Sequence, residues 1–553
     1  MCYHRTPRAA ARENLLYKTA DLVARALREA GVRHAFGIPG GEVLELLEAL
    51  RKAGVRFVLA KQELSAGFMA DAAWQLTGAP GVLVATLGPG FTNTVTPVAQ
   101  ALLDRSAMIV ITGEIPAALK GVYTHQILDQ AAVLRPLTKW SATIAARGAL
   151  EQVRKGIAIA TAPVPGPVHF DLPADIASAR QAARSGKAES ERVRAAGGAG
   201  DFAKVVSWLG RARRPLVLAG LGVLLDRAQA ELRRFVEGWR LPVITTYKAK
   251  GVLPEDHPLA LGGAGLSPVV DAMHLERVRD ADLVLCAGFD PVELRAEWIA
   301  PWDGEKRTVS LDLVPNTHHV YRCAVEYSGG IAGALAALAA AAPRRRPRRW
   351  PDRELERHRE AIRRRIARVP RRGLGPYQVT ATLREVFPRD TLATVDTGSH
   401  RILVNHVWRC YEPRGLLQSN GLGSMGYALP AAIAAKLLHP RRPVLAMTGE
   451  AGLDMVIGEM ALLAHYGLAL TIVVFRDDTL SLIKLKQERM RLPETGVRTG
   501  SPDYAALARA YGGEGVVVQS VAELGKAARA ALRAQRFTLI EARIDPAEYR
   551  DQM

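Results

Sequence analysis

Two stretches decide the fold of this chain: Leu445-Ala446-Met447-Thr448-Gly449-Glu450-Ala451-Gly452-Leu453 and Phe475-Arg476-Asp477-Asp478-Thr479. In each, an apolar strand ends in a polar turn, and the residues between them suffice for one helix and the return strand. We therefore expect Glu450 and Asp477 side by side at the carboxyl ends of neighbouring parallel strands, where open α/β sheets bind ligands. Glycines in such a turn let backbone N–H groups approach a phosphate.

Mg²⁺ is typically held by one or two carboxylates together with phosphate oxygens. The local pattern therefore predicts a Mg²⁺–diphosphate site. A solvated acidic loop is the alternative, because motifs this short also occur without function.

Short apolar runs bounded by Gly or Pro recur along the chain, separated by helical periodicity. They predict strands over Val55–Leu59, Gly81–Thr86, Met108–Thr112, Leu216–Gly220, Val243–Thr245, Asp282–Ala287, Thr308–Asp312, Leu392–Asp396, Val444–Thr448, Leu470–Phe475 and Thr538–Arg543. This alternation is typical of parallel βαβ units. The fold class is α/β, with three open parallel-sheet domains expected at 14–176, 201–342 and 375–545. A connector over 177–200 and an Arg-rich linker over 343–374 join them.

The composition favours a globular protein of the reducing cytoplasm. Of 553 residues 48% are hydrophobic, yet no apolar run reaches the ~18 residues of a membrane span, and Met1–Arg12 lacks an apolar signal core. Its four cysteines, at 2, 286, 323 and 410, are far apart and form no Cys-x-x-Cys pair. We expect neither a disulfide framework nor a thiolate metal cluster, and no membrane partner.

The positive charge is concentrated in one segment. Residues 343–372 contain fourteen arginines and four acids, and so carry +10 of the formal net charge of +19. Interspersed acids are typical of an exposed helix with many ion pairs. We expect weak, salt-sensitive adhesion to polyanions but no specific nucleic-acid partner.

Four further segments accompany the metal stretch in the order and spacing of a known family: Phe36-Gly37-Ile38-Pro39-Gly40-Gly41, Lys61-Gln62-Glu63, Gly88-Pro89-Gly90-Phe91-Thr92-Asn93 and Ser419-Asn420-Gly421-Leu422-Gly423-Ser424-Met425-Gly426. Together they make the chain resemble the thiamine-diphosphate-dependent acetolactate (acetohydroxyacid) synthase group, from about Asn14 to Asp545. The resemblance implies a pyrimidine-binding, a middle and a diphosphate-binding domain. It also implies thiamine diphosphate and Mg²⁺ as cofactors. The cofactor's two halves bind different subunits in this family, so a homodimer or homotetramer is expected.

The resemblance assigns residues to three roles. As catalytic residues it gives Glu63, which would hydrogen-bond N1′ of the aminopyrimidine, with Gln126 and His125 near the reaction centre. As metal ligands it gives the side chains of Glu450 and Asp477 and the backbone carbonyl of Thr479. As cofactor contacts it gives Gly37, Pro39, Gly40, Gly90, Asn93, Gly398, Ser399, His400, Gly423, Met425, Gly449, Ala451, Gly452 and Leu482.

Taken alone, several of these residues have a simpler interpretation. Glu63 could be a first-turn acid favoured by the helix dipole, Met425 could fill a core, and His400 could lie on a surface loop. For catalysis, a desolvated setting would keep the Glu63 carboxyl protonated near neutral pH.

The chain departs from the family pattern at the metal site, where relatives usually have Asp at 450 and often Asn at 477. Glu is one methylene longer and Mg²⁺ tolerates poor octahedral geometry badly. We expect metal binding that is weaker, or more tolerant of Ca²⁺ and Mn²⁺, than in Asp/Asn relatives.

Three departures concern the reaction centre. Gln62 replaces a common His, His125 replaces a common aromatic residue, and Lys486 stands where anabolic enzymes carry Trp. His125 could hydrogen-bond a substrate carboxylate or act as an acid or base, and it could equally serve packing. Lys486 would favour an anionic acceptor or point to solvent.

The middle domain resembles the flavin-independent enzymes of the group. It carries Gly288-Phe289-Asp290-Pro291-Val292-Glu293 and lacks the Phe-Asp-Asp-Arg sequence of the flavin-binding ones. We therefore expect no tightly held FAD.

The resemblance implies decarboxylation of a 2-oxoacid such as pyruvate and carboligation to a second 2-oxoacid. Two alternatives stay open: another thiamine-diphosphate-dependent decarboxylase or lyase, and a weakly active, non-catalytic paralogue.

Overall fold

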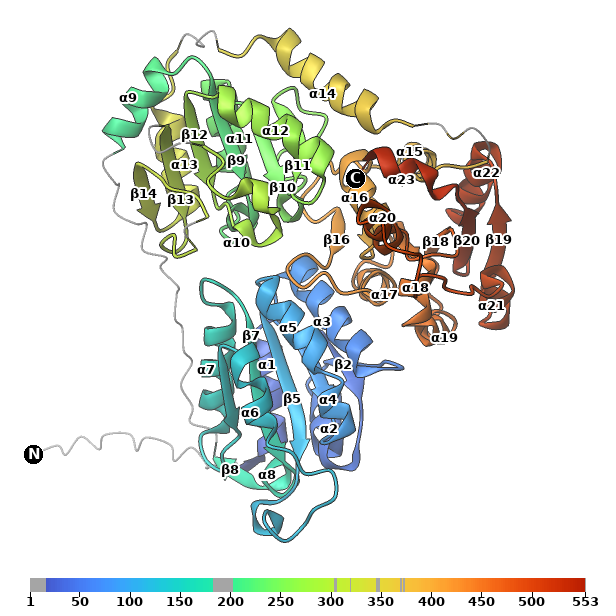
Figure 1. Cartoon of the computed structure of the whole chain (residues 1–553). Coiled ribbons are helices and arrows are strands. Elements are labelled where there is room, and N and C mark those ends of the chain that lie inside the picture. Colours follow the sequence, from blue (N-terminus) through green and yellow to red (C-terminus); the bar gives the residue numbers. More distant parts are fainter. Residues whose placement is uncertain are drawn as a thin grey trace, which may run out of the picture.

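The computed structural model describes residues 16–182, 202–302, 306–318, 320–344, 349–368, 370 and 373–552. The N-terminal tail and most of the 177–200 connector lie outside the described residues. Three six-stranded sheets, each with all neighbouring strands parallel, confirm the predicted α/β class (Figure 1).

The first sheet has the order β3-β2-β4-β5-β7-β6. A small antiparallel pair, β1 with β8, closes this part of the chain. Its elements are β1 Leu16–Lys18, α1 Thr19–Glu29, β2 His34–Ile38, α2 Leu44–Lys52, β3 Arg56–Leu59, α3 Glu63–Thr77, β4 Gly81–Ala85, α4 Pro89–Thr92, α5 Val95–Leu103, β5 Met108–Glu114, α6 Gln130–Leu134, β6 Trp140–Thr143, α7 Ala149–Thr161, β7 Pro167–Pro173, α8 Ala174–Ser178 and β8 Arg180–Ala182.

The second sheet has the order β11-β10-β9-β12-β13-β14. Its elements are α9 Ala203–Arg211, β9 Pro215–Ala219, α10 Leu221–Leu225, α11 Gln229–Trp239, β10 Val243–Thr246, β11 Ala260–Ala264, α12 Pro268–Asp280, β12 Leu283–Ala287, β13 Arg307–Asp312, β14 Val325–Ser328 and α13 Ile331–Ala340. The strand order reverses between β9 and β12, which makes their carboxyl ends the switch point of this sheet.

The third sheet has the order β16-β15-β17-β18-β20-β19. Its elements are α15 Pro376–Val386, β15 Leu392–Val395, α16 Ser399–Val407, β16 Leu416–Gln418, α17 Ala428–Leu438, β17 Val444–Gly449, α18 Glu450–Asp454, α19 Met460–His465, β18 Thr471–Arg476, α20 Ser481–Arg489, α21 Tyr504–Ala510, β19 Glu514–Val518, α22 Val521–Ala531, β20 Thr538–Arg543 and α23 Tyr549–Gln552.

All eleven predicted strands are present, with ends within two residues of the prediction. The strands missing from the prediction are mostly sheet edges, namely β6, β11, β14, β16 and β19. Three of these, β6, β14 and β19, are mostly half-buried or exposed and so show no continuous apolar run. The other two are buried, but β16 has only three residues and β11 contains two glycines. Two interior strands of the first sheet, β2 and β7, were also missed. In β7, His169 and Asp171 interrupt the apolar run, although both are buried.

The first and third domains pack directly on each other through α3 and α17. Phe68 and Tyr427 meet edge to face with ring centroids 5.5 Å apart, inside one apolar cluster shared by both domains. The Tyr427 hydroxyl also donates to Asp71 at 2.8 Å. The glycine-rich turn that precedes α17 is therefore held against the first domain.

The Arg-rich segment forms the predicted helix, α14 Asp352–Ile366, and two of its acids, Asp352 and Glu354, pair with arginines outside the helix. Glu354 accepts from Arg214 and Arg277 of the middle domain, at 2.8 and 2.9 Å. Leu355 and Ile362 are buried on its inner face. Ile362 also packs in one apolar cluster with Leu403 of the third domain, so the inner face of the helix lies against two domains.

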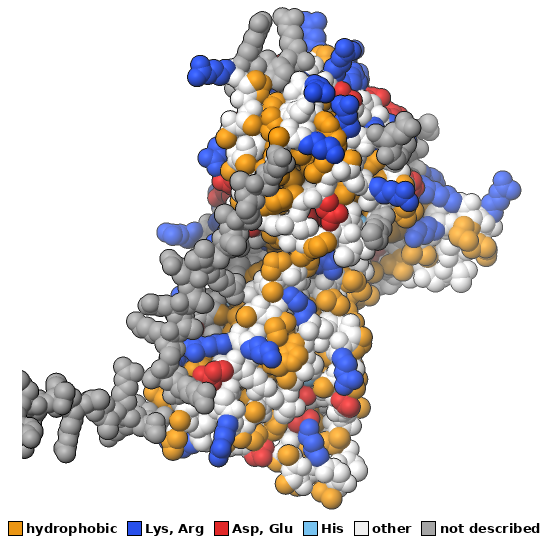
Figure 2. All heavy atoms as spheres, turned by 90° about the vertical axis from the view of Figure 1, so that its left-hand side faces the viewer, with side chains coloured by type: hydrophobic (Ala, Val, Ile, Leu, Met, Phe, Trp, Pro, Cys, Tyr) orange, Lys and Arg blue, Asp and Glu red, His pale blue; other side chains and the backbone are white. Residues whose placement is uncertain are grey.

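No described helix has the length and apolarity needed to cross a bilayer. On the face in Figure 2, Lys and Arg side chains are scattered among apolar and polar ones and form no continuous basic stripe.

Candidate active site

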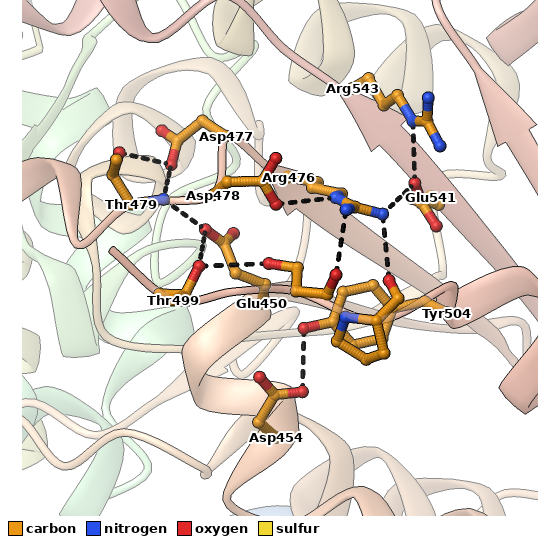
Figure 3. A network of polar contacts seen from close by, with 12 residues as sticks. Glu450, Asp454, Arg476, Asp477, Asp478, Thr479, Thr499, Tyr504, Glu541 and Arg543 are labelled. Atoms are coloured by element: carbon orange, nitrogen blue, oxygen red, sulfur yellow. Dashed lines mark hydrogen bonds and ion pairs between the residues drawn. The ribbon is translucent and has the colours of Figure 1, made fainter. Parts of the chain in front are cut away.

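The predicted carboxylate pair lies at the carboxyl edge of the third sheet. Strands β17 and β18 are neighbours, with Gly449 opposite Phe475 in the register. Glu450 therefore opens α18 beside the turn that carries Asp477. The backbone N–H of Thr479 donates to Oε1 of Glu450 at 3.0 Å and to Oδ1 of Asp477 at 3.1 Å (Figure 3). The expectation of two adjacent carboxylates is confirmed.

Both carboxyls are held in a setting that disfavours two negative charges. Burial, followed by the charge of Asp477, raises the pKa of Glu450 to about 8. Burial also raises the pKa of Asp477. A divalent cation between them would offset this repulsion, because an opposite charge favours the ionised forms. The electrostatics thus fit a cation ligand set.

Protein side chains alone do not complete a metal site here. Among the described residues, no group of three or more His, Cys, Asp or Glu is arranged to hold a metal. The Thr479 carbonyl accepts the Ser481 N–H at 2.9 Å, which leaves its second lone pair for a cation. The remaining ligands of a Mg²⁺ ion would be phosphate oxygens and water.

The turn after β18 is braced from the outside. Arg476 bridges Asp478 at 3.0 Å and the fully buried Glu541 at 2.8 Å (Figure 3). Asp478 adopts a left-handed backbone conformation, with φ +57°. This bracing holds Asp477 and Thr479 toward Glu450.

Two side-chain polar atoms at the N-terminus of α16 have no protein partner. Ser399 Oγ and His400 Nε2 are buried and have no hydrogen-bond partner. Buried polar atoms are nearly always hydrogen-bonded in native proteins, so an absent acceptor is indicated. A helix N-terminus with free donors suits a diphosphate. The residues present therefore fit the predicted group.

His400 is neutral in this setting and is not a surface residue. Burial, and secondarily the nearby Arg401 charge, lower its pKa to about 3. Its ring stacks on Phe475 with centroids 5.1 Å apart. A neutral imidazole carries a single N–H, so His400 donates to an anion at this position when the ring proton is on Nε2.

Asp396, at the end of β15, is a site residue that the sequence did not single out. It is buried, and its carboxylate accepts the backbone N–H groups of Gly426 at 3.0 Å and Tyr427 at 3.2 Å. Thr448 also donates to it, at 3.1 Å. Burial raises the Asp396 pKa to about 6. The sequence offered one signal for Asp396: it is an acid at the end of a predicted strand, just before Gly398-Ser399.

The Asp396 carboxylate leaves no room for a side chain at position 452, which is a glycine. A Cβ at position 452 would lie 2.3 Å from an oxygen of Asp396, which no ordinary contact permits. Other predicted glycines also lie at this edge: Gly398 before α16 and Gly449 at the end of β17. Ala451 follows in α18, and Leu482 is half-buried in α20.

The Met425 turn is set by glycines on both sides. Gly423 and Gly426 have φ +68° and +81°, conformations that L side chains rarely adopt. Met425 is half-buried and belongs to none of the apolar clusters, so core filling is not its role here.

A second unpredicted residue, Asp104 of the first domain, anchors the start of this loop. It is buried and accepts the backbone N–H groups of Asn420 at 3.2 Å and Gly421 at 2.6 Å. Lys248 of the middle domain lies 3.3 Å from its carboxylate. All three domains therefore meet at the loop that leads to Met425.

Four predicted residues of the first domain also converge. Glu63 opens α3, is 5% exposed, and accepts a hydrogen bond from the Asn93 amide at 3.0 Å. A Cβ at Gly90 would lie 3.1 Å from Oε1 of Glu63 and 2.7 Å from the Thr86 methyl. Gly40, after β2, faces the same Thr86. Gly37 and Pro39 belong to this strand end.

His125 and Gln126 lie on an exposed loop between β5 and α6, at the end of the first domain far from the other two (Figure 1). Gln126 has φ +60° and packs on Gly88. A Cβ added at Gly88 would lie 2.7 Å from the Cβ of Gln126. The loop therefore folds back toward the Gly88-Pro89-Gly90 turn. Lys486 is exposed on α20.

Comparison with known proteins assigns all three domains. The chain matches the thiamine pyrophosphate enzyme N-terminal TPP binding domain over 17–133, the central domain over 202–338 and the C-terminal TPP binding domain over 396–542. A probable acetolactate synthase large subunit of Methanocaldococcus jannaschii is 30% identical over 96% of this chain and 92% of its own length. This chain belongs to the thiamine-diphosphate-dependent, acetolactate synthase-like family.

Two further relatives in the family span nearly the whole chain. The acetolactate synthase of Bacillus subtilis is 28% identical over 95% of this chain and 93% of its own length. The acetolactate synthase isozyme 3 large subunit of Escherichia coli is 28% identical over 96% of this chain and 95% of its own length.

The two groups of predicted site residues lie in different domains, the Glu63 cluster in the first and the Glu450–Asp477 pair in the third. Among the described residues, no hydrogen bond or ion pair joins the Glu63 cluster to the Glu450–Asp477 pair. The residue roles taken from the family resemblance stay predictions.

Proposed function

We propose that this protein is a thiamine-diphosphate-dependent carboligase that decarboxylates a 2-oxoacid such as pyruvate and joins the two-carbon unit to a second 2-oxoacid. One observation carries the proposal: the paired carboxylates of Glu450 and Asp477 lie at the edge where Ser399 and His400 present unpartnered donors. The relatives named acetolactate synthase support this choice of reaction.

At the diphosphate end, Ser399 and His400 would donate to the diphosphate. Glu450, Asp477 and the Thr479 carbonyl would hold Mg²⁺. Gly398, Gly449, Ala451 and Gly452 would allow close approach of the backbone, and Leu482 would contact the cofactor from α20. When bound, thiamine diphosphate supplies the carbanion chemistry.

At the pyrimidine end, the carboxyl of Glu63 would hydrogen-bond N1′ and hold a proton there, with Asn93 orienting it at 3.0 Å. Gly37, Pro39, Gly40 and Gly90 would leave room for the ring. Gly423 and Met425 would support it from the other side. His125 and Gln126 would reach the substrate from their loop.

We propose that two chains assemble each site, as a homodimer or homotetramer. Large apolar side chains lie exposed near the Glu63 cluster and the Glu450–Asp477 pair. Leu59 is 44% exposed, Leu422 39%, Met455 55% and Ile483 43%. A partner chain that completes the site would bury them, and closed symmetric assemblies are the common solution. The domain boundaries 14–176, 201–342 and 375–545 are part of this proposal. So are a cytoplasmic location, the lack of a specific nucleic-acid partner and the lack of a tightly held FAD.

The test is incubation of the purified protein with thiamine diphosphate, Mg²⁺ and pyruvate alone. Release of CO₂ with formation of acetolactate is the expected result. Aldehyde, or no product from pyruvate, would support the alternative of a different decarboxylase or lyase, which Gln62, His125 and Lys486 motivate. A panel of other 2-oxoacids then identifies the substrate.

The second alternative is a paralogue that keeps the fold but binds the cofactor poorly, and Glu450 motivates it. Titration with thiamine diphosphate and Mg²⁺, followed by circular dichroism, separates the two. Absent or very weak binding of thiamine diphosphate, without any product from the 2-oxoacid panel, would favour this paralogue and contradict our proposal.

A further inference from the structure

The Arg-rich helix α14 covers a cleft that the proposed reaction does not use. The cleft has a volume of about 800 Å³, a size typical of small-molecule sites. Residues of β11 and α12 line it from the middle domain, and residues of α15 and α16 line it from the third domain. It lies at the edge strand β11, away from the switch point between β9 and β12.

Five arginines line this cleft, from both walls and the covering helix. They are Arg359 and Arg363 of α14, Arg384 of α15, and Arg389 and Arg409 of the connections that follow α15 and α16. Arg363 and Arg409 are exposed, and among the described residues neither makes an ion pair. Their charges are therefore available to a ligand.

Two of these arginines are partly buried. Burial lowers the pKa of Arg359; the charge of Arg363 acts in the same direction, and the charges of Glu356, Asp352 and Glu360 oppose it. Burial also lowers the pKa of Arg384. An anion in the cleft would stabilise both guanidinium charges.

The acids that line the cleft do not cancel this charge. Glu255 forms an ion pair with the buried Lys250 at 2.6 Å, and Asp256 forms one with Arg389 at 2.7 Å. Glu385 is the third lining acid. The carbonyl of Asn405, at the end of α16, accepts from Lys250 at 2.7 Å. The net charge of the residues that line the cleft therefore remains positive.

The floor of the cleft is apolar. Val270 of α12 and Ile362 and Ile366 of α14 form a small buried cluster there, with Tyr377 and Val407 packed against it. Arg389 and Arg384 stack on Tyr411, at 3.5 and 5.3 Å from the ring centroid. An apolar floor beneath a basic rim suits an organic molecule with several anionic groups.

We propose that this cleft binds a small organic polyanion, with two or more phosphate or carboxylate groups, at a site separate from the cofactor site. Arg363 contacts it from α14 and Arg409 from the third-domain wall. The Arg-rich segment thereby acquires a ligand-binding role in addition to joining the domains.

The test uses the holoenzyme saturated with thiamine diphosphate and Mg²⁺, so that the cofactor site is occupied. Calorimetric titration at constant ionic strength uses two probes, benzene-1,3,5-tricarboxylate and a sugar bisphosphate. Saturable binding of at least one is expected, and the two arms distinguish carboxylate from phosphate ligands. Arg363→Glu and Arg409→Glu should each weaken that binding by about tenfold or more, because each removes one charge-assisted contact.

The matched control is Arg364→Glu, which makes the same charge change at the next, exposed position of α14 outside the cleft lining. It should leave the affinity within about twofold. Thermal unfolding and basal activity of the three variants confirm that each is folded. The proposal is overturned if neither probe binds saturably, or if Arg363→Glu and Arg364→Glu weaken binding equally, since that outcome reports only attraction to net charge.

Discussion

Glu450 and Asp477 share a single backbone donor, the N–H of Thr479, which lies 3.0 Å from one carboxylate and 3.1 Å from the other. This shared bond fixes how far apart the carboxylates stand before any metal arrives. Thr499 also approaches Oε1 of Glu450, at 3.5 Å. The longer side chain of Glu therefore reaches across the turn, where a shorter Asp would stop closer to β17.

Glu450→Asp should raise Mg²⁺ affinity, because the shorter carboxylate leaves room for octahedral geometry. The expected gain is several-fold, measured by Mg²⁺ titration in the presence of saturating thiamine diphosphate. Ca²⁺ and Mn²⁺ titrations should show a smaller change.

Glu514→Asp, on the exposed strand β19, is the matched control and should leave Mg²⁺ affinity unchanged. An unchanged or reduced affinity in Glu450→Asp would refute the idea that Glu450 weakens the site.

Glu63→Gln and Asp477→Ala should each abolish activity, since one removes the acid at the pyrimidine end and the other a metal ligand. A loss of about 10²–10⁴-fold is expected for a removed proton-transfer group. If each site takes Glu63 from one chain and Asp477 from another, mixing the two inactive proteins should restore activity.

With random exchange of subunits, about a quarter of the sites in the mixture are intact. The measurement is carboligase activity after co-refolding or co-expression, against each variant alone. No recovery, in a mixture shown by mass spectrometry to contain hybrid oligomers, would count against a site shared between chains.

Gly452→Ala should destabilise the protein by about 1–3 kcal/mol, the usual effect of overpacking. The added Cβ would meet the Asp396 carboxylate, which cannot move away because the backbone N–H groups of Gly426 and Tyr427 hold it. Thiamine diphosphate affinity should fall with it, since the Met425 turn depends on the same carboxylate.

Gly333→Ala, in α13, is the control because a Cβ there meets nothing within 4 Å. It should be neutral or slightly stabilising. Equal unfolding temperatures for the two variants would show that the added contact with Asp396 does not destabilise the protein.

His169→Gln should show a pH-dependent stability defect. Burial lowers the His169 pKa to about 4, whereas an unfolded His titrates near 6.5. Between these values the unfolded state binds more protons, so wild-type stability from this residue is complete above about pH 6.5 and declines as the pH falls. At pH 5 the decline is about 2 kcal/mol.

The variant lacks this titration, so its stability deficit relative to wild type should narrow by about 2 kcal/mol from pH 7 to pH 5. Thermal unfolding of both proteins at the two pH values measures it. A deficit that stays constant would mean that His169 is not held neutral by burial.

Local patterns predicted most of this molecule. Apolar runs bounded by glycine or proline located most of the interior strands, because burial on both faces leaves a signal within a few neighbouring residues. Spacing along the chain was enough to place Glu450 and Asp477 together, since consecutive βαβ strands pair at adjacent positions in β17 and β18. The family resemblance then supplied Glu63, whose bond to Asn93 depends on two turns of one sheet.

The amino-acid sequence by itself determined the α/β class, the sheet-edge carboxylates and the glycines that flank them, because each depends on residues close in the chain. Only the tertiary structure decided that Asp396 holds the Met425 turn, that Asp104 and Lys248 bring three domains to one loop, and that α14 covers a basic cleft. These relationships join residues far apart in the chain. They arise from how whole domains pack, and local periodicity carries no information about that packing.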